Sequence, residues 1–288
     1  MGRMSRRMVQ ITTAIGINSY YTGFLQGTVY SGSMKNICLP VLNCSSCPGA
    51  WGACPLAIIQ VGMAGTPKYT AAYLTLGILP LLGLTFGRFI CGWMCPFGLL
   101  QEMLYKVPSP KVFLKGKLLL LENVKYAILG FFVLLLPAWN FFGTGSTAFC
   151  RYICPVEILE ARMPIILARP FVLLNFGVLF TVKLVFLIGL LVLAIVLCKP
   201  FCRFLCPLGA IYSLANSISL FRYKVDSSKC IECGKCQEEC PMKIPVFQKP
   251  NHRECMRCSD CLNCPTDALS VQSITCKTDQ ERVYYGGE

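Results

Sequence analysis

The chain has 288 residues, of which 55% are hydrophobic and only 14% are charged, and its formal net charge is +13. Soluble globular chains usually carry about 25% charged residues, so this composition indicates an integral membrane protein rather than a soluble domain. The positive charge does not indicate nucleic-acid binding, because basic residues also mark the cytoplasmic side of membrane proteins. The sequence shows no signal-peptide cleavage pattern, so its 20 cysteines are better explained as metal ligands than as disulfides. The one histidine, His252, excludes a membrane haem held by two histidines of this chain.

Four apolar segments could cross the ~30 Å hydrocarbon core of a bilayer, which takes about 20 residues of helix. We predict a transmembrane helix in each of residues 8–29, 70–89, 124–140 and 176–197. The first segment is the most polar, with Asn18, Ser19 and Gln26 inside it, and an interfacial helix is the alternative there. In the second, Pro80 predicts a kink.

Basic residues orient the predicted spans. They concentrate at the N-terminus, in the loop after the second span and in the segment after the fourth span. By the positive-inside rule these regions are cytoplasmic, so both termini face the cytoplasm of a cell (inner) membrane. Lys183, inside the fourth span, is either a functional charge or a side chain that reaches the outer interface. Residues 1–222 therefore form an all-α membrane domain, and the polar, cysteine-rich residues 223–288 form a separate small domain with its tail.

Four similar Cys-Pro motifs follow the four predicted spans. They read ACPLAIIQ from Ala53, MCPFGLLQ from Met94, ICPVEILE from Ile153 and LCPLGAIY from Leu205. Proline is favoured at the first helical position, so each motif predicts a short or re-entrant helix whose N–H groups and positive dipole end point back at the cysteine. The simplest description is a two-fold internal repeat in which each unit is span, motif, span, motif.

The predicted topology pairs these motifs. The two that follow the second and fourth spans face the cytoplasm and offer four thiolates, the number that a cubane iron–sulfur cluster needs: Cys91, Cys95, Cys202 and Cys206. The outer side offers Cys44, Cys47, Cys54, Cys150 and Cys154, with Cys38 as a further candidate. The sequence does not choose four among these six. The alternatives are zinc at the inner set and disulfides on an oxidising outer face. Cys198, at the end of the fourth span, is interpreted as a buried apolar thiol.

The C-terminal domain contains the C-x2-C-x2-C-x3-C-P run of bacterial ferredoxins, at Cys230, Cys233, Cys236 and Cys240. A second run, whose last gap is one residue shorter, follows at Cys255, Cys258, Cys261 and Cys264. In two-cluster ferredoxins the fourth cysteine of each run serves the other cluster. One cluster is therefore expected on Cys230, Cys233, Cys236 and Cys264, and the other on Cys255, Cys258, Cys261 and Cys240. We predict a small α+β ferredoxin-like domain with two [4Fe-4S] clusters, and a zinc ribbon is the alternative.

Taken together, LNCSSCPGAWGACP, CGWMCPFGLLQ, FCRYICPVEILEA, PFCRFLCPLGAIY and the ferredoxin-type end resemble the membrane polyferredoxins. This is a family of 4Fe-4S binding proteins related to the membrane iron–sulfur subunit of periplasmic nitrate reductase and to the membrane part of the nitrous-oxide reductase regulator. The resemblance covers nearly the whole chain. It implies electron transfer through iron–sulfur clusters at a membrane, and it supplies neither donor nor acceptor, because family members serve different systems.

The main hypothesis is an electron conduit with four [4Fe-4S] clusters, two in the ferredoxin-like domain, one at the inner face and one at the outer face. Its expected partners are membrane lipid and other redox proteins on both faces, and no nucleic acid. Under this hypothesis the chain needs no catalytic residue of its own. One alternative is a quinol or quinone oxidoreductase subunit, for which Lys183, Glu157 and Glu160 are the candidate proton-handling residues. The other is a reductase used in the maturation of another metalloenzyme.

Overall fold

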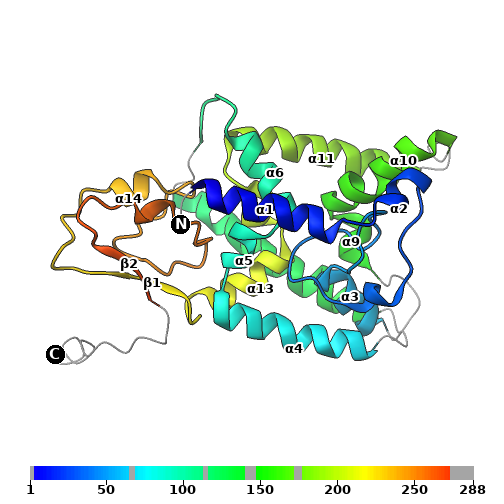
Figure 1. Ribbon diagram of the computed structural model, residues 1–288, viewed down its shortest axis with the longest axis horizontal. Coiled ribbons are helices and arrows are strands. Elements are labelled where there is room, and N and C mark those ends of the chain that lie inside the picture. The colour runs from blue at the N-terminus through cyan, green and yellow to red at the C-terminus, as the bar shows by residue number, and fades with distance from the viewer. Residues whose placement is uncertain (1–2, 65–68, 113–115, 140–146, 172–176, 273–288) are drawn as a thin grey trace.

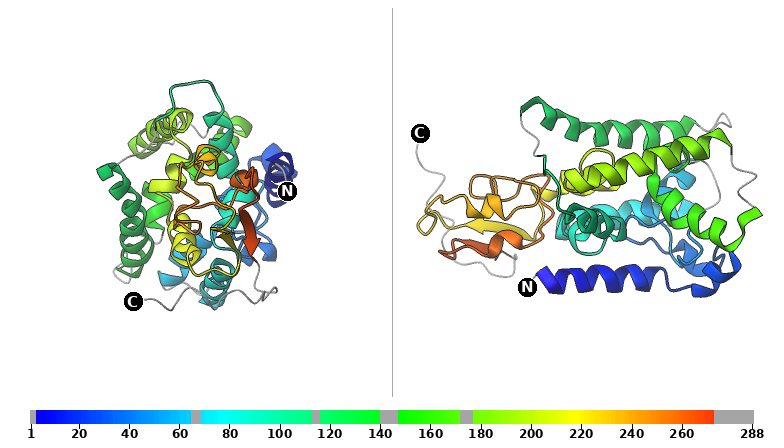
Figure 2. Two further views of the ribbon diagram at one scale, coloured as in Figure 1. Left: turned by 90° about the vertical axis from the view of Figure 1, so that its left-hand side faces the viewer. Right: turned by 90° about the horizontal axis from the view of Figure 1, so that it is seen from above.

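The computed structural model describes residues 3–272, apart from residues 65–68, 113–115, 140–146 and 172–176. Most of the described chain is helical and forms an elongated body, with a small unit that contains strands at one end (Figure 1). Most of the long helices run along the long axis of this body, as the view from above also shows (Figure 2). The N-terminus lies beside the strand-containing unit (Figure 1).

The helices of the body are numbered in chain order. They are α1 (Arg3–Ile17), α2 (Tyr21–Gln26), η1 (Ser33–Asn36), α3 (Pro55–Met63), α4 (Tyr69–Phe86), α5 (Phe89–Trp93), α6 (Pro96–Tyr105), η2 (Gly116–Asn123), α7 (Val124–Ile128), η3 (Leu129–Leu135), α8 (Leu136–Trp139), α9 (Ala148–Tyr152), η5 (Glu157–Arg162), α10 (Met163–Ala168), α11 (Val178–Val196), α12 (Pro200–Phe204) and α13 (Pro207–Asn216). Of the η elements, η1 and η2 are 3₁₀ helices, whereas η3 and η5 are π-helical stretches continuous with α-helices.

Among the described residues, two helices are long and apolar enough to cross a membrane. They are Leu119–Trp139, which runs from η2 to α8, and α11. They correspond to the third and fourth predicted spans, although the third helix begins before residue 124, and residues 140 and 176 at the predicted ends lie outside the described residues. The apolar part of α4, Ala71–Phe86, is shorter, and Pro80 lies inside α4 without ending it. The four-span architecture therefore stays a prediction.

The first predicted span is not one helix, and its predicted boundaries at residues 8–29 are wrong. The helix begins earlier and ends at Ile17, and α2 starts only at Tyr21. The segment around Trp51 holds the end of α1. The indole Nε1 of Trp51 donates to the carbonyl of Gly16 at 2.7 Å, and its backbone N–H donates to the carbonyl of Ile17 at 3.4 Å. These bonds satisfy carbonyl groups that a helix end leaves without a partner, so the helix stops there.

Apolar side chains on four helices point away from the body. Representative exposed fractions are 54% for Ile15 in α1, 60% for Leu81 in α4, 66% for Leu120 in η2 and 65% for Val185 in α11. Soluble monomers rarely expose contiguous apolar surface of this kind, which marks membrane or protein contact. The helices that the sequence predicts to be spans thus share an apolar outer surface, including α1 and α4.

The small unit at the end of the body is built on an antiparallel pair of strands, β1 (Arg222–Val225) and β2 (Leu269–Gln272), and contains the short helices α14 (Lys235–Glu238) and η7 (Asp260–Leu262). The two cysteine runs of this unit repeat the same backbone conformation. In the first run Glu232 and Gly234 take left-handed φ angles of 50° and 73°, and in the second run Arg257 and Ser259 take 51° and 66°. These residues flank the second cysteine of each run, so the two runs turn in the same way.

The shorter gap of the second run has a physical explanation. Around Cys236 the chain forms the α-helical turn α14, whereas around Cys261 it forms the 3₁₀ helix η7. A 3₁₀ helix has 3.0 residues per turn instead of 3.6. The fourth cysteine, Cys264, is therefore brought round with one residue fewer than Cys240.

Buried polar contacts join the ferredoxin-like unit to the helical body. Glu254 pairs with both Arg88 and Lys125, and all three side chains are almost inaccessible to solvent. A further bond runs from the body to the unit, in which the indole Nε1 of Trp93 donates to the carbonyl of Arg257 at 3.0 Å. Charges buried in this way are paired because an isolated charge is very costly to remove from water. The contacts fix the unit against the body.

Candidate functional site

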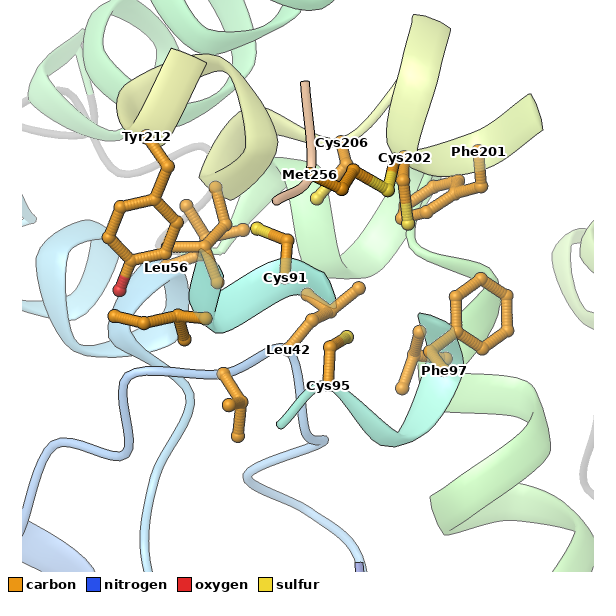
Figure 3. Close-up of a cluster of buried hydrophobic side chains, with 14 of the residues drawn as sticks. Leu42, Leu56, Cys91, Cys95, Phe97, Phe201, Cys202, Cys206, Tyr212 and Met256 are labelled. Carbon is orange, nitrogen blue, oxygen red and sulfur yellow. The ribbon is translucent and has the colours of Figure 1, made fainter. Parts of the chain in front are cut away.

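The inner-face cysteines predicted to act together line one buried cavity, whose thiols are Cys91, Cys95, Cys202 and Cys206. They come from two pairs of elements far apart in the sequence, α5 with α6 and α12 with α13. Figure 3 shows the four side chains around a common space between these elements. The other walls are mostly apolar and include Leu42 and Ile90.

Two of these thiols cap helices. Cys95 is the N-cap of α6, and its sulfur accepts the N–H of Gly98 at 3.4 Å. Cys206 caps α13 in the same way, with the N–H of Gly209 at 3.3 Å. Proline follows each cysteine at the start of the helix, where its missing N–H costs nothing. As the motif predicts, the helix N-termini direct N–H groups and their positive dipole ends at the sulfur atoms.

The outer-face cysteines surround a larger cavity of about 630 Å³, which contains four thiols: Cys44, Cys54, Cys150 and Cys154. The two remaining candidates do not line it. Cys47 directs its thiol at the side-chain oxygen of Asn18, 3.5 Å away. Cys38 forms a parallel bridge with Ala53 and packs against a small separate apolar cluster. The structure therefore brings together four of the six candidates that the sequence left open.

The ferredoxin-like unit has two further cavities with four cysteines each from the predicted sets. One is lined by Cys230, Cys233, Cys236 and Cys264. The other is lined by Cys240, Cys255, Cys258 and Cys261, and also by Cys198. Cys198 is buried, as the sequence predicts, but it faces this cavity as a fifth thiol. Nothing in its own spacing signals this position, because the contact arises only when the unit docks on the body.

The donor set of these cavities fits iron–sulfur clusters. Four thiolates are the ligand set of a [4Fe-4S] cluster. Burial raises the pKa of Cys91, Cys54 and Cys255 to about 11, so these thiols are protonated at neutral pH as long as nothing is bound. These cysteines would hold iron as thiolates, because metal ligation needs a deprotonated thiol, and the metal would supply the positive charge that a buried thiolate needs. Every cysteine within the described ranges is a free thiol, and none is in a disulfide.

Buried cations beside two of the cysteine cavities were missed by the sequence analysis. Arg88 donates from Nη2 to the carbonyl of Cys202 at 3.0 Å. Lys199 lines the second ferredoxin-type cavity and pairs with Glu102 at 2.6 Å. The signal was available in the sequence, since RFIC and KPFC each place a basic residue three positions before the first cysteine of an inner motif. Such cations offset negative charge that a cluster brings into the low-dielectric interior.

Lys183 also has its place in the structure. Its ammonium group is buried, donates to the carbonyl of Cys150 at 3.0 Å and pairs with Glu157. It therefore does not extend to the outer interface, which was one of the two alternatives. Glu157 is paired in addition with Arg162 at 2.8 Å, and all three side chains line the outer cavity. Glu160, the third proton-handling candidate, accepts the backbone N–H of Cys44 at 2.7 Å.

Neighbouring cavities are close to one another. Leu42 lines both the inner and the outer cavity. Met256 lines the second ferredoxin-type cavity, and its backbone lies against Gly92, the residue next to Cys91 of the inner set. The inner and outer sets of thiols thus share Leu42 as a wall, and the inner set adjoins the segment around Met256.

Comparisons with known proteins agree with the cysteine pattern. The chain matches one 4Fe-4S binding domain family over residues 70–118, 126–159 and 179–225, and another 4Fe-4S binding domain family over residues 223–245. The protein MJ0750 of Methanocaldococcus jannaschii is 35% identical over 197 residues, which cover 67% of this chain and 75% of that protein. YccM of Escherichia coli, which is named for electron transport, is 28% identical over 220 residues, 72% of this chain and 57% of YccM. The ferredoxin-type protein NapH of Haemophilus influenzae is 27% identical over 183 residues, 62% of this chain and 57% of NapH. No solved structure matches.

Proposed function

Because the chain belongs to the membrane-associated, polyferredoxin-like family of 4Fe-4S binding proteins related to NapH, we propose that it is an iron–sulfur electron-transfer subunit with four [4Fe-4S] clusters. The two ferredoxin-type sets of cysteines hold two clusters. The inner set holds the third, and Cys44, Cys54, Cys150 and Cys154 hold the fourth. Electrons move between the ferredoxin-like unit and the opposite end of the body.

The observation that carries this proposal is the order of the four sets. In Figure 1 the parts of the molecule that contain them follow one another along the long axis: the ferredoxin-like unit, with two sets, at one end, α5 and α13 of the inner set in the middle, and α3 and α9 of the outer set toward the other end. A soluble enzyme would need one set of cluster ligands at a substrate pocket, whereas an electron conduit needs several sets in a row. Leu42, which lines both the inner and the outer cavity, keeps the step between these two sets short.

The membrane position follows from the same axis. We place α1, α4, the helix Leu119–Trp139 and α11 across the bilayer, since all four expose apolar side chains to the outside. The start of α1, with Arg6 and Arg7, lies beside the ferredoxin-like unit, where Arg6 pairs with Asp260 at 3.6 Å, so the positive-inside rule puts both in the cytoplasm. The non-helical backbone near the cysteines lies inside the protein, where it is tolerated at membrane depth.

The residues of the chain do three things in this function. The cysteines hold the clusters, which supply one-electron redox chemistry when bound. The apolar walls, such as Leu42 and Ile90, exclude water from the inner site. The ferredoxin-like unit offers a point of access for a soluble redox partner, because Cys233 is exposed and the neighbouring Ile231 is exposed by 66%.

A second candidate function is that of a quinol or quinone oxidoreductase subunit. It is favoured by the size of the outer cavity and by the buried Lys183–Glu157 pair in its wall, which could take up or release a proton beside the cysteines. A quinone analogue would then change the rate at which the outer site is reduced. Under the conduit proposal alone, the analogue has no effect.

Vesicles test the proposal directly. The protein is reconstituted with a membrane-impermeant electron acceptor trapped inside, and a membrane-impermeant reductant is added outside. We expect reduction of the trapped acceptor by the unmodified protein and almost none by the Cys150→Ala variant, whose outer set has only three thiols left. Equal rates for the two proteins, at equal protein content, would contradict electron transfer through the outer site.

A further inference from the structure

Two glutamines occupy the same position in two of the Cys-Pro motifs. Gln60 ends ACPLAIIQ in α3, and Gln101 ends MCPFGLLQ in α6. Both side chains are completely buried. A buried amide has to find partners for its oxygen and its NH₂ group, so its contacts show what the position does.

Each glutamine reaches across to the first cysteine of the partner motif. Gln101 donates from Nε2 to the sulfur of Cys202 at 3.3 Å, and its Oε1 accepts the backbone N–H of Phe201 at 3.1 Å. Its Nε2 also donates to the carbonyl of Phe97, one turn earlier in its own helix, at 3.3 Å. The side chain is thereby held at three points.

The outer site repeats these contacts bond for bond. Gln60 donates from Nε2 to the sulfur of Cys150 at 3.5 Å and to the carbonyl of Leu56 at 3.0 Å, and its Oε1 accepts the backbone N–H of Phe149 at 2.9 Å. In both sites the glutamine lies far in sequence from the cysteine and phenylalanine that it contacts, and the same arrangement thus forms twice. This repetition makes a chance contact an inadequate explanation.

The orientation of each amide is determined by the backbone. The N–H groups of Phe149 and Phe201 belong to the first turns of α9 and α12, where a helix supplies no acceptor. An N–H group has to donate, so the glutamine oxygen faces it and the NH₂ group faces the sulfur. Exchanging oxygen and nitrogen would set donor against donor and oxygen against thiolate.

We propose that Gln60 and Gln101 tune the reduction potentials of the outer and inner clusters through N–H···S hydrogen bonds to Cys150 and Cys202. This inference rests on the proposed function, in which these cysteines are cluster ligands. Reduction adds one negative charge to the cluster, and a hydrogen bond to a more negative acceptor is stronger. Each glutamine therefore favours the reduced form of its own site and raises its potential.

The other two motifs differ at this position, so the device serves one ligand in each site. In ICPVEILE the position is Glu160, which accepts the N–H of Cys44 and donates to no sulfur. In LCPLGAIY it is Tyr212, whose hydroxyl donates to the carbonyl of Pro40 at 2.9 Å. The glutamines are positioning and tuning residues and take no part in holding the clusters.

Redox titration of the loaded protein followed by EPR tests the inference. The inner and outer signals are first assigned by their loss in Cys91→Ala and Cys150→Ala. Gln101→Met keeps the volume and removes the donor, and we expect it to lower the midpoint potential of the inner site. The expected size is that of a tenfold fall in the equilibrium constant for reduction, about 59 mV for a one-electron couple. The potential of the outer site should stay unchanged. Gln60→Met should lower the potential of the outer site and leave that of the inner site unchanged.

Gln10→Met is the matched control. Gln10 is also completely buried, but its Nε2 donates to the carbonyl of Gly92 at 2.8 Å and not to a sulfur. This variant should move neither potential. Full iron content with both midpoints unmoved in Gln101→Met and Gln60→Met would overturn the inference and leave the proposed function standing.

A second measurement needs no substitution. In the unmodified protein labelled with ¹⁵N in the glutamine side chains, pulsed EPR should detect hyperfine coupling of ¹⁵N to both sites. If the methionine variants fail to retain iron, this coupling decides: its presence supports the inference, and its absence overturns it. Absence of iron from both sites in the unmodified protein would instead refute the proposed function, and this inference with it.

Discussion

Replacing Gly92 by alanine tests how closely the ferredoxin-like unit is docked on the body. Gly92 lies in α5 next to Cys91, and a Cβ atom added to it would lie 2.3 Å from the backbone oxygen of Met256. Real Cβ contacts are essentially never shorter than 3.0 Å, so the two segments have to separate by a further 0.7 Å. The obstacle is a backbone atom in a loop that is tied down on both sides, by Glu254 and by Arg257.

Such overpacking costs about 1–3 kcal/mol. We expect Gly92→Ala to lower the Tm of the loaded protein by several degrees and to speed hydrogen exchange in the segment around Met256. The matched control is Gly77→Ala in α4, where nothing lies within 4 Å of the added Cβ and the helix gains up to about 1 kcal/mol in propensity. If Gly92→Ala were as stable as Gly77→Ala, with unchanged exchange near Met256, the close approach would be wrong.

Two further predictions, each with its control substitution, address docking and the outer site. Glu254→Gln leaves two buried cations without their shared carboxylate, so the free energy of unfolding should fall by about 3–5 kcal/mol in denaturant titrations. The exposed ion pair of Asp226 with Lys229, at 3.9 Å, provides the control, because Asp226→Asn should leave the free energy of unfolding unchanged. Equal free energies of unfolding for the two variants would refute the role of Glu254. Cys44→Ala should lose about four iron atoms per chain, whereas Cys47→Ala should lose none. Loss of iron from Cys47→Ala but not from Cys44→Ala would show that Cys47, and not Cys44, is the ligand of the outer site.

Counting and topology were sufficient to group most of the cysteines. The sequence paired Cys91 and Cys95 with Cys202 and Cys206, and these thiols line one cavity. Long apolar runs also indicated two of the helices, at residues 124–140 and 176–197, where the structure has Leu119–Trp139 and Val178–Val196. These features are local or follow from which side of a membrane a loop occupies.

What the sequence could not supply depends on tertiary contact. Cys198 faces a ferredoxin-type cavity only because the unit docks against the end of α11. The end of α1 at Ile17 is decided by Trp51, which is far away in the chain. Gln60 and Gln101 could have been noticed, because they end two of the four repeated motifs, but the sequence does not show which sulfur they reach. Hydropathy had likewise predicted one helix over residues 8–29, because it does not register a break that side chains from elsewhere impose.

The central claim, that this chain holds four [4Fe-4S] clusters in a row, is tested most directly by counting iron and sulfide after anaerobic purification. Four clusters give about 16 iron and 16 sulfide atoms per chain. Cys91→Ala and Cys150→Ala should each lose about four of each and keep the ferredoxin-type EPR signals. About eight iron atoms in the unmodified protein, unchanged in both variants, would confine the clusters to the ferredoxin-like unit and contradict the account.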